Sequence, residues 1–295
     1  MNFVTNILPS ETKFSKDLFH IREEFPLLFV ETNDRLNALH KVVREEKLVQ
    51  QKKMSIDGYF QQDSGVIQFK LEIASLAALV DRLNILGLPP VVLFYTDFAW
   101  LIFYSLNDLL TDALGDDFMF LPDFWAWHVD PQKGQAGWTP HRDRSKNALF
   151  ADGSIKSVTC WIPLTEADPL NGCMYIVPKQ HDLSYGVEGA KINLKNGLPS
   201  IRALPAKPGD VLVWCQEVLH WGAQSSEFSK KPRMSIALEA QSGKADPLNL
   251  PLINPNELLS ETSRLKLIGK QMLQYKHMHS LSTQQEQFAL YLINQ

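Results

Sequence analysis

The spacing of apolar residues predicts helices in the first third of the chain. Apolar side chains recur every three or four residues over 35–51, over 73–86 and from about 97 to 115, which is the periodicity of an amphipathic helix. Thr96 or Asp97 would cap the third helix, and Gly87 and Gly115 would end the second and third. A run at 65–69 is compatible with a strand. The N-terminal part is therefore predicted to be largely helical.

The pattern changes at about residue 118. Short apolar or aromatic runs now alternate with Gly, Pro and Asn turns, a pattern typical of a sandwich or barrel. The expected strands are 124–129, 157–162, 174–177, 211–214 and 233–240. A linker rich in Pro and Asn follows at 246–256, and 257–292 again has helical spacing.

These patterns predict a mainly β fold with helical flanks. We expect one domain over 1–295, in which a mostly helical N-terminal flank (1–117) precedes a sandwich core (118–242). A linker and a helical C-terminal flank (243–295) complete it. Because each flank has an apolar face to bury, both are expected to pack on the outside of one sheet.

Composition narrows the possible functions. Hydrophobic residues make up 45% and charged residues 21% of the 295 positions, as in ordinary globular proteins. A net charge of −4 argues against a nucleic-acid partner, which requires clustered Lys and Arg. Three widely spaced cysteines and an N-terminus without a basic, apolar leader indicate a cytoplasmic protein without disulfides. The most apolar stretch, 91–103, is too short to span a membrane and contains Asp97.

The first candidate for chemistry is the segment 138–143, which reads WTPHRD. In an extended strand His141 and Asp143 would point the same way, because side chains alternate faces. An imidazole and a carboxylate are two of the three ligands in the 2-His-1-carboxylate site of non-haem Fe(II) enzymes. Such a pair alone is also compatible with a surface turn.

Two later positions could complete a site. His220 follows the apolar strand 211–214 and could supply the second imidazole, although a histidine beside Trp and Leu is more often a core residue. Arg233 opens the strand 233–240 and shares a face with Ser235, while large apolar residues alternate on the other face. This face could line a cavity in which Arg233 binds a carboxylate and Ser235 adds a hydroxyl.

Together these motifs resemble the phytanoyl-CoA dioxygenase family of Fe(II)/2-oxoglutarate-dependent oxygenases. The resemblance rests on separate segments that occur in the family's order between about 118 and 241. They are WTPHRD at 138–143, WIPLT at 161–165, NGCMYIVP at 171–178 with His181 behind it, PGD at 208–210, and then His220 and Arg233.

The resemblance implies a double-stranded β-helix, or jelly roll. It implies that His141, Asp143 and His220 hold Fe(II) and that Arg233 binds the distal carboxylate of the co-substrate 2-oxoglutarate. His128 and Thr159 would lie on strands that line the co-substrate pocket. The reaction would use O2 to hydroxylate a C–H bond of a small organic substrate, releasing succinate and CO2. One departure concerns this pocket: many relatives have Gly and Ser after the distal histidine, where this chain has Trp221, Gly222 and Ala223.

Two alternatives stay open. The same fold could carry a metalloenzyme of other chemistry, which would not need a dicarboxylate anchor such as Arg233. It could also be a non-catalytic binding module, although such relatives usually lose a metal ligand. The sequence identifies neither the substrate nor the oligomeric state.

Overall fold

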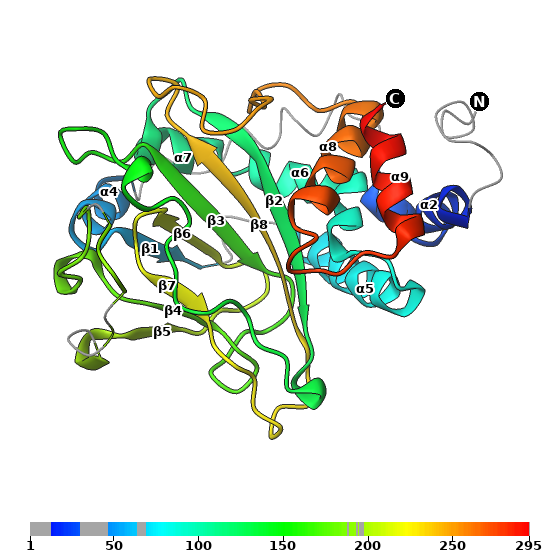
Figure 1. The fold of residues 1–295 in the computed structure, drawn as a ribbon, viewed down its shortest axis with the longest axis horizontal. Coiled ribbons are helices and arrows are strands. Elements are labelled where there is room, and N and C mark those ends of the chain that lie inside the picture. Colours follow the sequence, from blue (N-terminus) through cyan, green and yellow to red (C-terminus); the bar gives the residue numbers. More distant parts are fainter. Residues whose placement is uncertain are drawn as a thin grey trace.

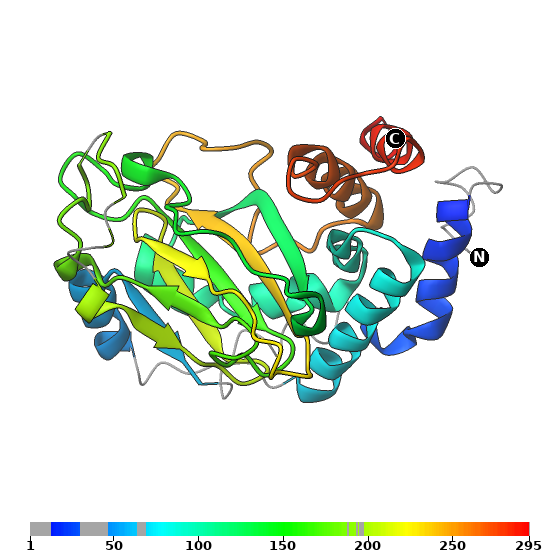
Figure 2. The ribbon, with the colours of Figure 1, turned by 60° about the horizontal axis from the view of Figure 1, so that its bottom comes forward.

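The computed structural model describes residues 13–29, 47–63, 69–187, 189–192, 194 and 198–294. Two antiparallel sheets form the core, and most helices lie beyond one edge and the outer face of the larger sheet (Figures 1 and 2). The larger sheet has the strand order β1-β6-β3-β8-β2, and the smaller has β5-β4-β7. Their bounds are Tyr59–Gln62 (β1), Met119–Val129 (β2), Ser157–Pro163 (β3), Met174–Ile176 (β4), Arg202–Leu204 (β5), Val211–Cys215 (β6), His220–Gly222 (β7) and Arg233–Gln241 (β8).

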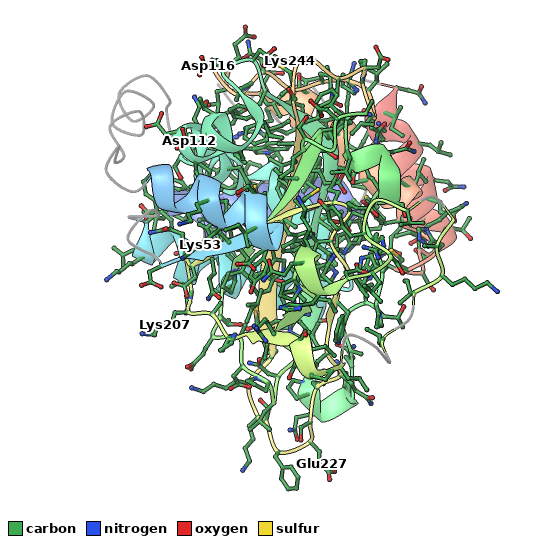
Figure 3. The ribbon with its side chains drawn as sticks, turned by 90° about the vertical axis from the view of Figure 1, so that its left-hand side faces the viewer. Lys53, Asp112, Asp116, Lys207, Glu227 and Lys244 are labelled. Atoms are coloured by element: carbon green, nitrogen blue, oxygen red, sulfur yellow. The ribbon has the colours of Figure 1, made fainter. Side chains whose placement is uncertain are left out.

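The helices precede and follow strands β2 to β8, as the sequence predicted, whereas β1 lies between two of the N-terminal helices. They are α2 (Lys13–Glu24), α4 (Lys47–Asp57), α5 (Lys70–Leu86), α6 (Asp97–Tyr104), α7 (Asn107–Leu114), α8 (Glu261–Gln274) and α9 (Thr283–Ile293), with a buried 3-10 helix η2 (Pro90–Tyr95) before α6. None of the helices that the structure describes is both long and apolar enough to cross a bilayer. Charged side chains such as Lys53, Lys207 and Glu227 are exposed at the periphery (Figure 3).

Local signals account for the ends of the helices. Gly87 ends α5 with a φ of 69°, a left-handed conformation that glycine adopts without strain. The Thr96 hydroxyl accepts a hydrogen bond from the Ala99 amide and caps α6. The expectation of one helix from 97 to 115 was wrong, because the chain breaks at Ser105, whose hydroxyl donates to the Ile102 carbonyl.

Two other expected elements lie mostly outside the residues that the structure describes. Of the helix expected at 35–51, only the end falls within the described residues, where α4 begins. The strand expected at 65–69 lies almost wholly outside them. All five expected strands are present, but the short strands β5 and β7 and the edge strand β1 were not predicted. Strands of three or four residues are too short to show a period.

Alternation along β3, β6 and β8 separates two hydrophobic clusters. On the outer face, residues such as Cys160, Val213 and Ile236 pack with the helical flanks in one cluster. On the inner face, Trp161 and Trp214 pack between the two sheets with side chains of β4 and β5. The outer cluster buries the helices, as expected for amphipathic flanks, and the inner space between the sheets is left for a site. This architecture is the expected double-stranded β-helix with helical flanks.

Candidate metal and co-substrate site

His141, Asp143 and His220 converge between the sheets. The backbones of His141 and His220 form an isolated antiparallel bridge with two N–H···O bonds of 3.0 Å. This bridge holds the two imidazole rings with their centroids 4.4 Å apart. One potential ligand atom from each of the three side chains lies within 4.8 Å of the others. The spacing argument therefore identified residues that do come together, although the bridge replaces the regular strand expected at His141.

Hydrogen bonds fix the orientation of both imidazoles. The Nδ1 atom of His141 lies 2.7 Å from the Thr139 carbonyl oxygen, and that of His220 lies 3.0 Å from the Val218 carbonyl oxygen. A carbonyl only accepts, so each Nδ1 carries a proton, and Nε2 is the atom of each ring that can bind a metal. In metal-binding histidines, the ring nitrogen that does not bind the metal usually donates such a hydrogen bond, which fixes the orientation of the ring.

The Asp143 carboxylate is oriented in the same way. Its Oδ2 accepts hydrogen bonds from the Thr159 hydroxyl at 2.7 Å and from the indole N–H of Trp214 at 2.9 Å. Its Oδ1 lies 3.4 Å from the Nε2 of each histidine. Burial alone would raise the pKa of this carboxyl group, but His220 and His141 hold it well below its ordinary range. Oδ2 is thus hydrogen-bonded to protein groups, while Oδ1 faces the two histidines.

Arg233 is the second notable feature of the site. Its side chain is buried, with an exposed fraction of 2%, and its guanidinium lies 5.7 Å from the centre of the Trp161 ring. It donates one hydrogen bond to the Ser235 hydroxyl at 2.7 Å, while its Nε has no partner. No described carboxylate forms an ion pair with it, and burial lowers its pKa to about 10. A buried cation without an anion is costly, and a carboxylate ligand would remove that cost.

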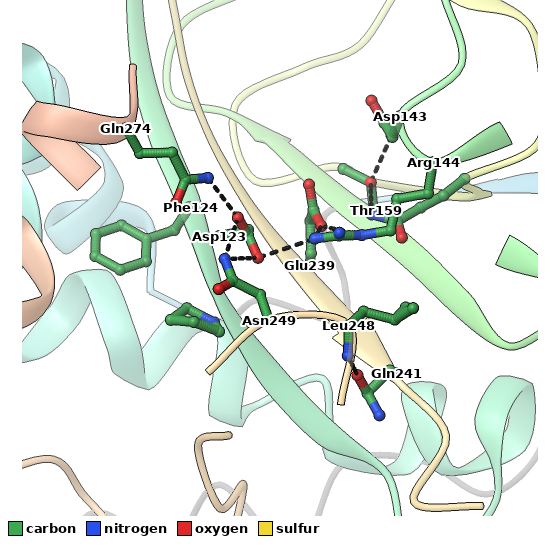
Figure 4. A network of polar contacts seen from close by, with 12 residues as sticks. Asp123, Phe124, Asp143, Arg144, Thr159, Glu239, Gln241, Leu248, Asn249 and Gln274 are labelled. Carbon is green, nitrogen blue, oxygen red and sulfur yellow. Dashed lines mark hydrogen bonds and ion pairs between the residues drawn. The ribbon is translucent and has the colours of Figure 1, made fainter. Parts of the chain in front are cut away.

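A polar network that the sequence did not reveal lies beside the three candidate metal ligands His141, Asp143 and His220, which we call the metal cluster (Figure 4). Arg144, one residue after Asp143, donates to Glu239 at 2.6 Å and to Asp123 at 2.9 Å. Asp123 also accepts bonds from the side-chain amides of Asn249 and Gln274. The network thereby connects the loop of Asp143 to β2, β8 and the end of α8. Burial raises the pKa of Glu239 to about 8, because Arg144 offsets only part of the burial and two further carboxylates lie nearby.

Two other candidates from the sequence, His128 and Arg142, lie near carboxylates outside the three-ligand site. His128 does not line the cavity around the metal cluster; it faces an adjoining groove and its Nε2 is 3.1 Å from Asp81. Its role in co-substrate binding stays a prediction. Arg142 is buried in an ion pair with Asp182 at 2.6 Å and therefore has a structural partner.

The unusual residues after His220 are also explained. Trp221 points away from the cluster and stacks on Tyr175, with ring centroids 5.8 Å apart. Gly222 faces the site, and its backbone lies so close to Gly137 that a Cβ atom on either residue would be within 3.0 Å of the other's backbone. The close approach of these two segments therefore requires glycine at both positions.

Aromatic side chains enclose the cavity. Trp125, Trp127 and Trp138 line it, and Tyr275 reaches it from the end of α8, 5.0 Å from Trp125 between ring centroids. Sequence periodicity could not place Tyr275 in the site, because α8 follows β8 through a long linker. Glu239 could have been found, since it shares the strand face of Arg233.

The fold and the site together define a class: jelly-roll proteins with a His-X-Asp pair and a distal His. The family model for phytanoyl-CoA dioxygenase (PhyH) matches residues 91–234, the segment that contains His141, Asp143, His220 and Arg233. A comparison with curated protein sequences found no match.

Several solved structures have a similar fold. The epimerase SnoN, solved with Fe3+, alpha-ketoglutarate and nogalamycin RO, is 18% identical over 70% of this chain and 96% of its own, with a TM-score of 0.50. HygX from Streptomyces hygroscopicus, solved with nickel, 2-oxoglutarate and hygromycin B, is 15% identical over 70% and 90%, with a TM-score of 0.50. The non-heme monooxygenase ThoJ is 14% identical over 76% and 99%, with a TM-score of 0.52.

Proposed function

We propose that this protein is an Fe(II)- and 2-oxoglutarate-dependent dioxygenase that uses O2 to hydroxylate a C–H bond of a small organic substrate, with release of succinate and CO2. The single observation that carries the proposal is the pairing of an oriented two-histidine, one-carboxylate cluster with a buried arginine that has no carboxylate partner among the described residues. A metal site alone would fit many reactions. The unpaired Arg233 beside it indicates an acidic co-substrate.

The donor set fits ferrous iron. Two neutral imidazole nitrogens and one carboxylate oxygen are the ligands of the facial triad that leaves other positions of Fe(II) open. His141, Asp143 and His220 would hold the metal through Nε2, Oδ1 and Nε2, because their other polar atoms are bonded to protein groups. Thr159 and Trp214 keep the carboxylate from turning.

Arg233 fits the far carboxylate of 2-oxoglutarate. Its planar guanidinium can form two parallel hydrogen bonds to a carboxylate, and Ser235 holds one of its nitrogens in place. The aromatic ring of Trp161 lies against the guanidinium and restricts its movement. These contacts would fix one end of the co-substrate while its keto acid end lies at the metal cluster.

Bound iron would supply the activation of O2 and the oxidation of the substrate, which no side chain can perform. The protein orients the ligands, anchors the co-substrate and limits water with aromatic walls such as Trp125 and Trp138. The epimerase SnoN has a similar fold, so analysis of the reaction product must decide between hydroxylation and other oxidations. Gain of one oxygen atom by the substrate would support hydroxylation.

The flanks belong to the proposed functional unit. One hydrophobic cluster contains side chains of α5, α6, α8 and α9 together with the outer face of β3 and β8, and α8 also delivers Tyr275 to the cavity. We therefore propose that the helical flanks and the jelly-roll core act as one domain.

An anaerobic titration tests the proposal. Fe(II) and then 2-oxoglutarate are added to metal-free protein, and the weak visible charge-transfer band of the chelated keto acid is recorded. We expect the band in the wild type and its loss in Arg233→Ala. Iron binding without the band would favour a metalloenzyme of other chemistry, and failure to bind metal would favour a binding module.

A further inference from the structure

A second hollow adjoins the metal cavity and shares its walls. It is a groove of about 870 Å3, and Trp125, Trp127, Gly137 and Trp138 line both spaces. Pockets of roughly 300–1,000 Å3 enclose most of a drug-sized ligand. A molecule in the groove would reach the metal cluster past these shared residues, so the groove is the natural place for the primary substrate.

The groove lies where the helical flanks meet the edge strand of the larger sheet. The end of α5, the strand β2, the segment 135–139 and the connection from α8 to α9 all contribute. The Gln285 side chain donates to the Gly87 carbonyl oxygen at 2.6 Å and joins the start of α9 to the end of α5, which lie at the same side of the molecule (Figure 1). The walls are therefore held in a defined arrangement.

Neutral hydrogen-bonding groups face the groove. Asn84, Thr139, Ser280 and Gln284 line it, and none of their side chains has a hydrogen-bond partner in the described protein. Amides and hydroxyls can each donate and accept, so they match the hydroxyl and carbonyl groups of a ligand. The half-buried faces of Trp127 and Trp138 provide flat apolar surfaces beside them.

The charge of the groove is equally informative. Among its described lining residues there is no Lys, Arg, Asp or Glu, and burial lowers the pKa of His279, one of its two histidines. The start of α9 also offers no free anion site, because Ser282 and Gln285 cap it reciprocally. The diphosphate and ribose phosphate of a coenzyme A thioester would thus find no cationic partner here.

We infer that the primary substrate is a neutral, ring-containing small molecule that bears hydroxyl groups, and that it binds in this groove. The ring lies against the tryptophan faces, and the hydroxyl groups bond to the free amide and hydroxyl side chains. An acyl coenzyme A thioester is not the substrate. That this molecule is oxidised at the metal site rests on the proposed function. Its binding in the groove does not.

The test measures binding in metal-free protein, so that it does not depend on iron or 2-oxoglutarate. The probes are neutral aryl glycosides, neutral flavonoid glycosides and palmitoyl-coenzyme A, followed by saturation-transfer difference NMR and calorimetry. Asn84→Trp places a bulky ring in the groove. Leu71→Trp is the matched control, because it lies on the same helix, is already exposed, and is about 20 Å away at 1.5 Å per residue.

We expect at least one neutral probe to bind, with affinity reduced about tenfold or more by Asn84→Trp and unchanged by Leu71→Trp. Binding of palmitoyl-coenzyme A that Asn84→Trp abolishes would overturn the inference, and so would failure of every neutral probe to bind. The anaerobic band is recorded on the same preparations. Its absence would refute the proposed function while leaving the binding result to decide the substrate class.

Discussion

Replacing Arg233 with methionine should make the metal-free protein more stable while removing its response to 2-oxoglutarate. Burial lowers the pKa of this guanidinium by more than two units, to about 10, and each pKa unit corresponds to about 1.36 kcal/mol. Holding the charged form inside the fold therefore costs about 3 kcal/mol at neutral pH. Methionine is similar in length and flexible, so it can fill the space without a charge.

One contact is lost in exchange. The Ser235 hydroxyl would no longer receive the hydrogen bond from Arg233, at a cost of about 1 kcal/mol. The net gain is about 2 kcal/mol. For a chain of this size that raises Tm by about 4 °C, at roughly 2 °C per kcal/mol.

The assay is thermal unfolding of metal-free and Fe(II)-loaded protein under anaerobic conditions. Excess 2-oxoglutarate at about 100 times Kd should stabilise the loaded wild type by about 2.7 kcal/mol, and it should leave Arg233→Met unchanged. Arg264→Met is the control, because Arg264 is also buried but forms an ion pair with Asp97. Removing that partner should destabilise the protein by about 3 kcal/mol. A fall in Tm of Arg233→Met as large as that of Arg264→Met would refute the view that Arg233 lacks a partner.

Three other predictions concern the surroundings of the metal cluster. Thr159→Val should weaken metal binding about tenfold or more in a metal titration, because Asp143 loses a bond that orients it; unchanged affinity would contradict this role. Arg144→Ala should lower the free energy of unfolding by about 3 kcal/mol, since the buried Asp123 carboxylate loses its cation, and denaturant unfolding would measure it. Because the folded protein retains a proton on Glu239 up to about pH 8 and the unfolded chain releases it near 4.5, stability of the metal-free protein should fall as pH rises between these values. Glu239→Gln should flatten that slope, and an equal slope in both proteins would show that another group is responsible.

The pattern of the sequence predicted five of the eight described strands and the faces of β8, because burial imposes alternation. In β8, Arg233, Ser235 and Glu239 lie on the inner face, while Met234 and Ile236 pack against the helices, as the alternation indicated. The same reasoning placed His141 and Asp143 together. It succeeded because their spacing is local, and a two-residue separation leaves few ways to arrange the side chains.

Contacts between distant segments escaped prediction. Trp214 holds Asp143 across 71 positions, and Gln274 binds Asp123 across 151. Neither pair leaves a periodic signal, because each depends on how the strands and α8 are placed in space. His128 shows the opposite difficulty: its alternation was regular, but alternation does not tell which of two adjoining hollows a side chain faces.

The arginines of this protein show how a functional charge differs from a structural one. Arg142, Arg144 and Arg264 each form an ion pair with at least one described carboxylate, so their charges are compensated within the fold. Arg233 is at least as buried, and among the described residues its guanidinium contacts a hydroxyl and an aromatic ring but no carboxylate. Stability alone would favour an apolar residue at this position. A buried charge without a described anion, beside the three candidate metal ligands, supports the proposal that Arg233 binds a carboxylate of the co-substrate, and this argument is more specific than the one from the fold.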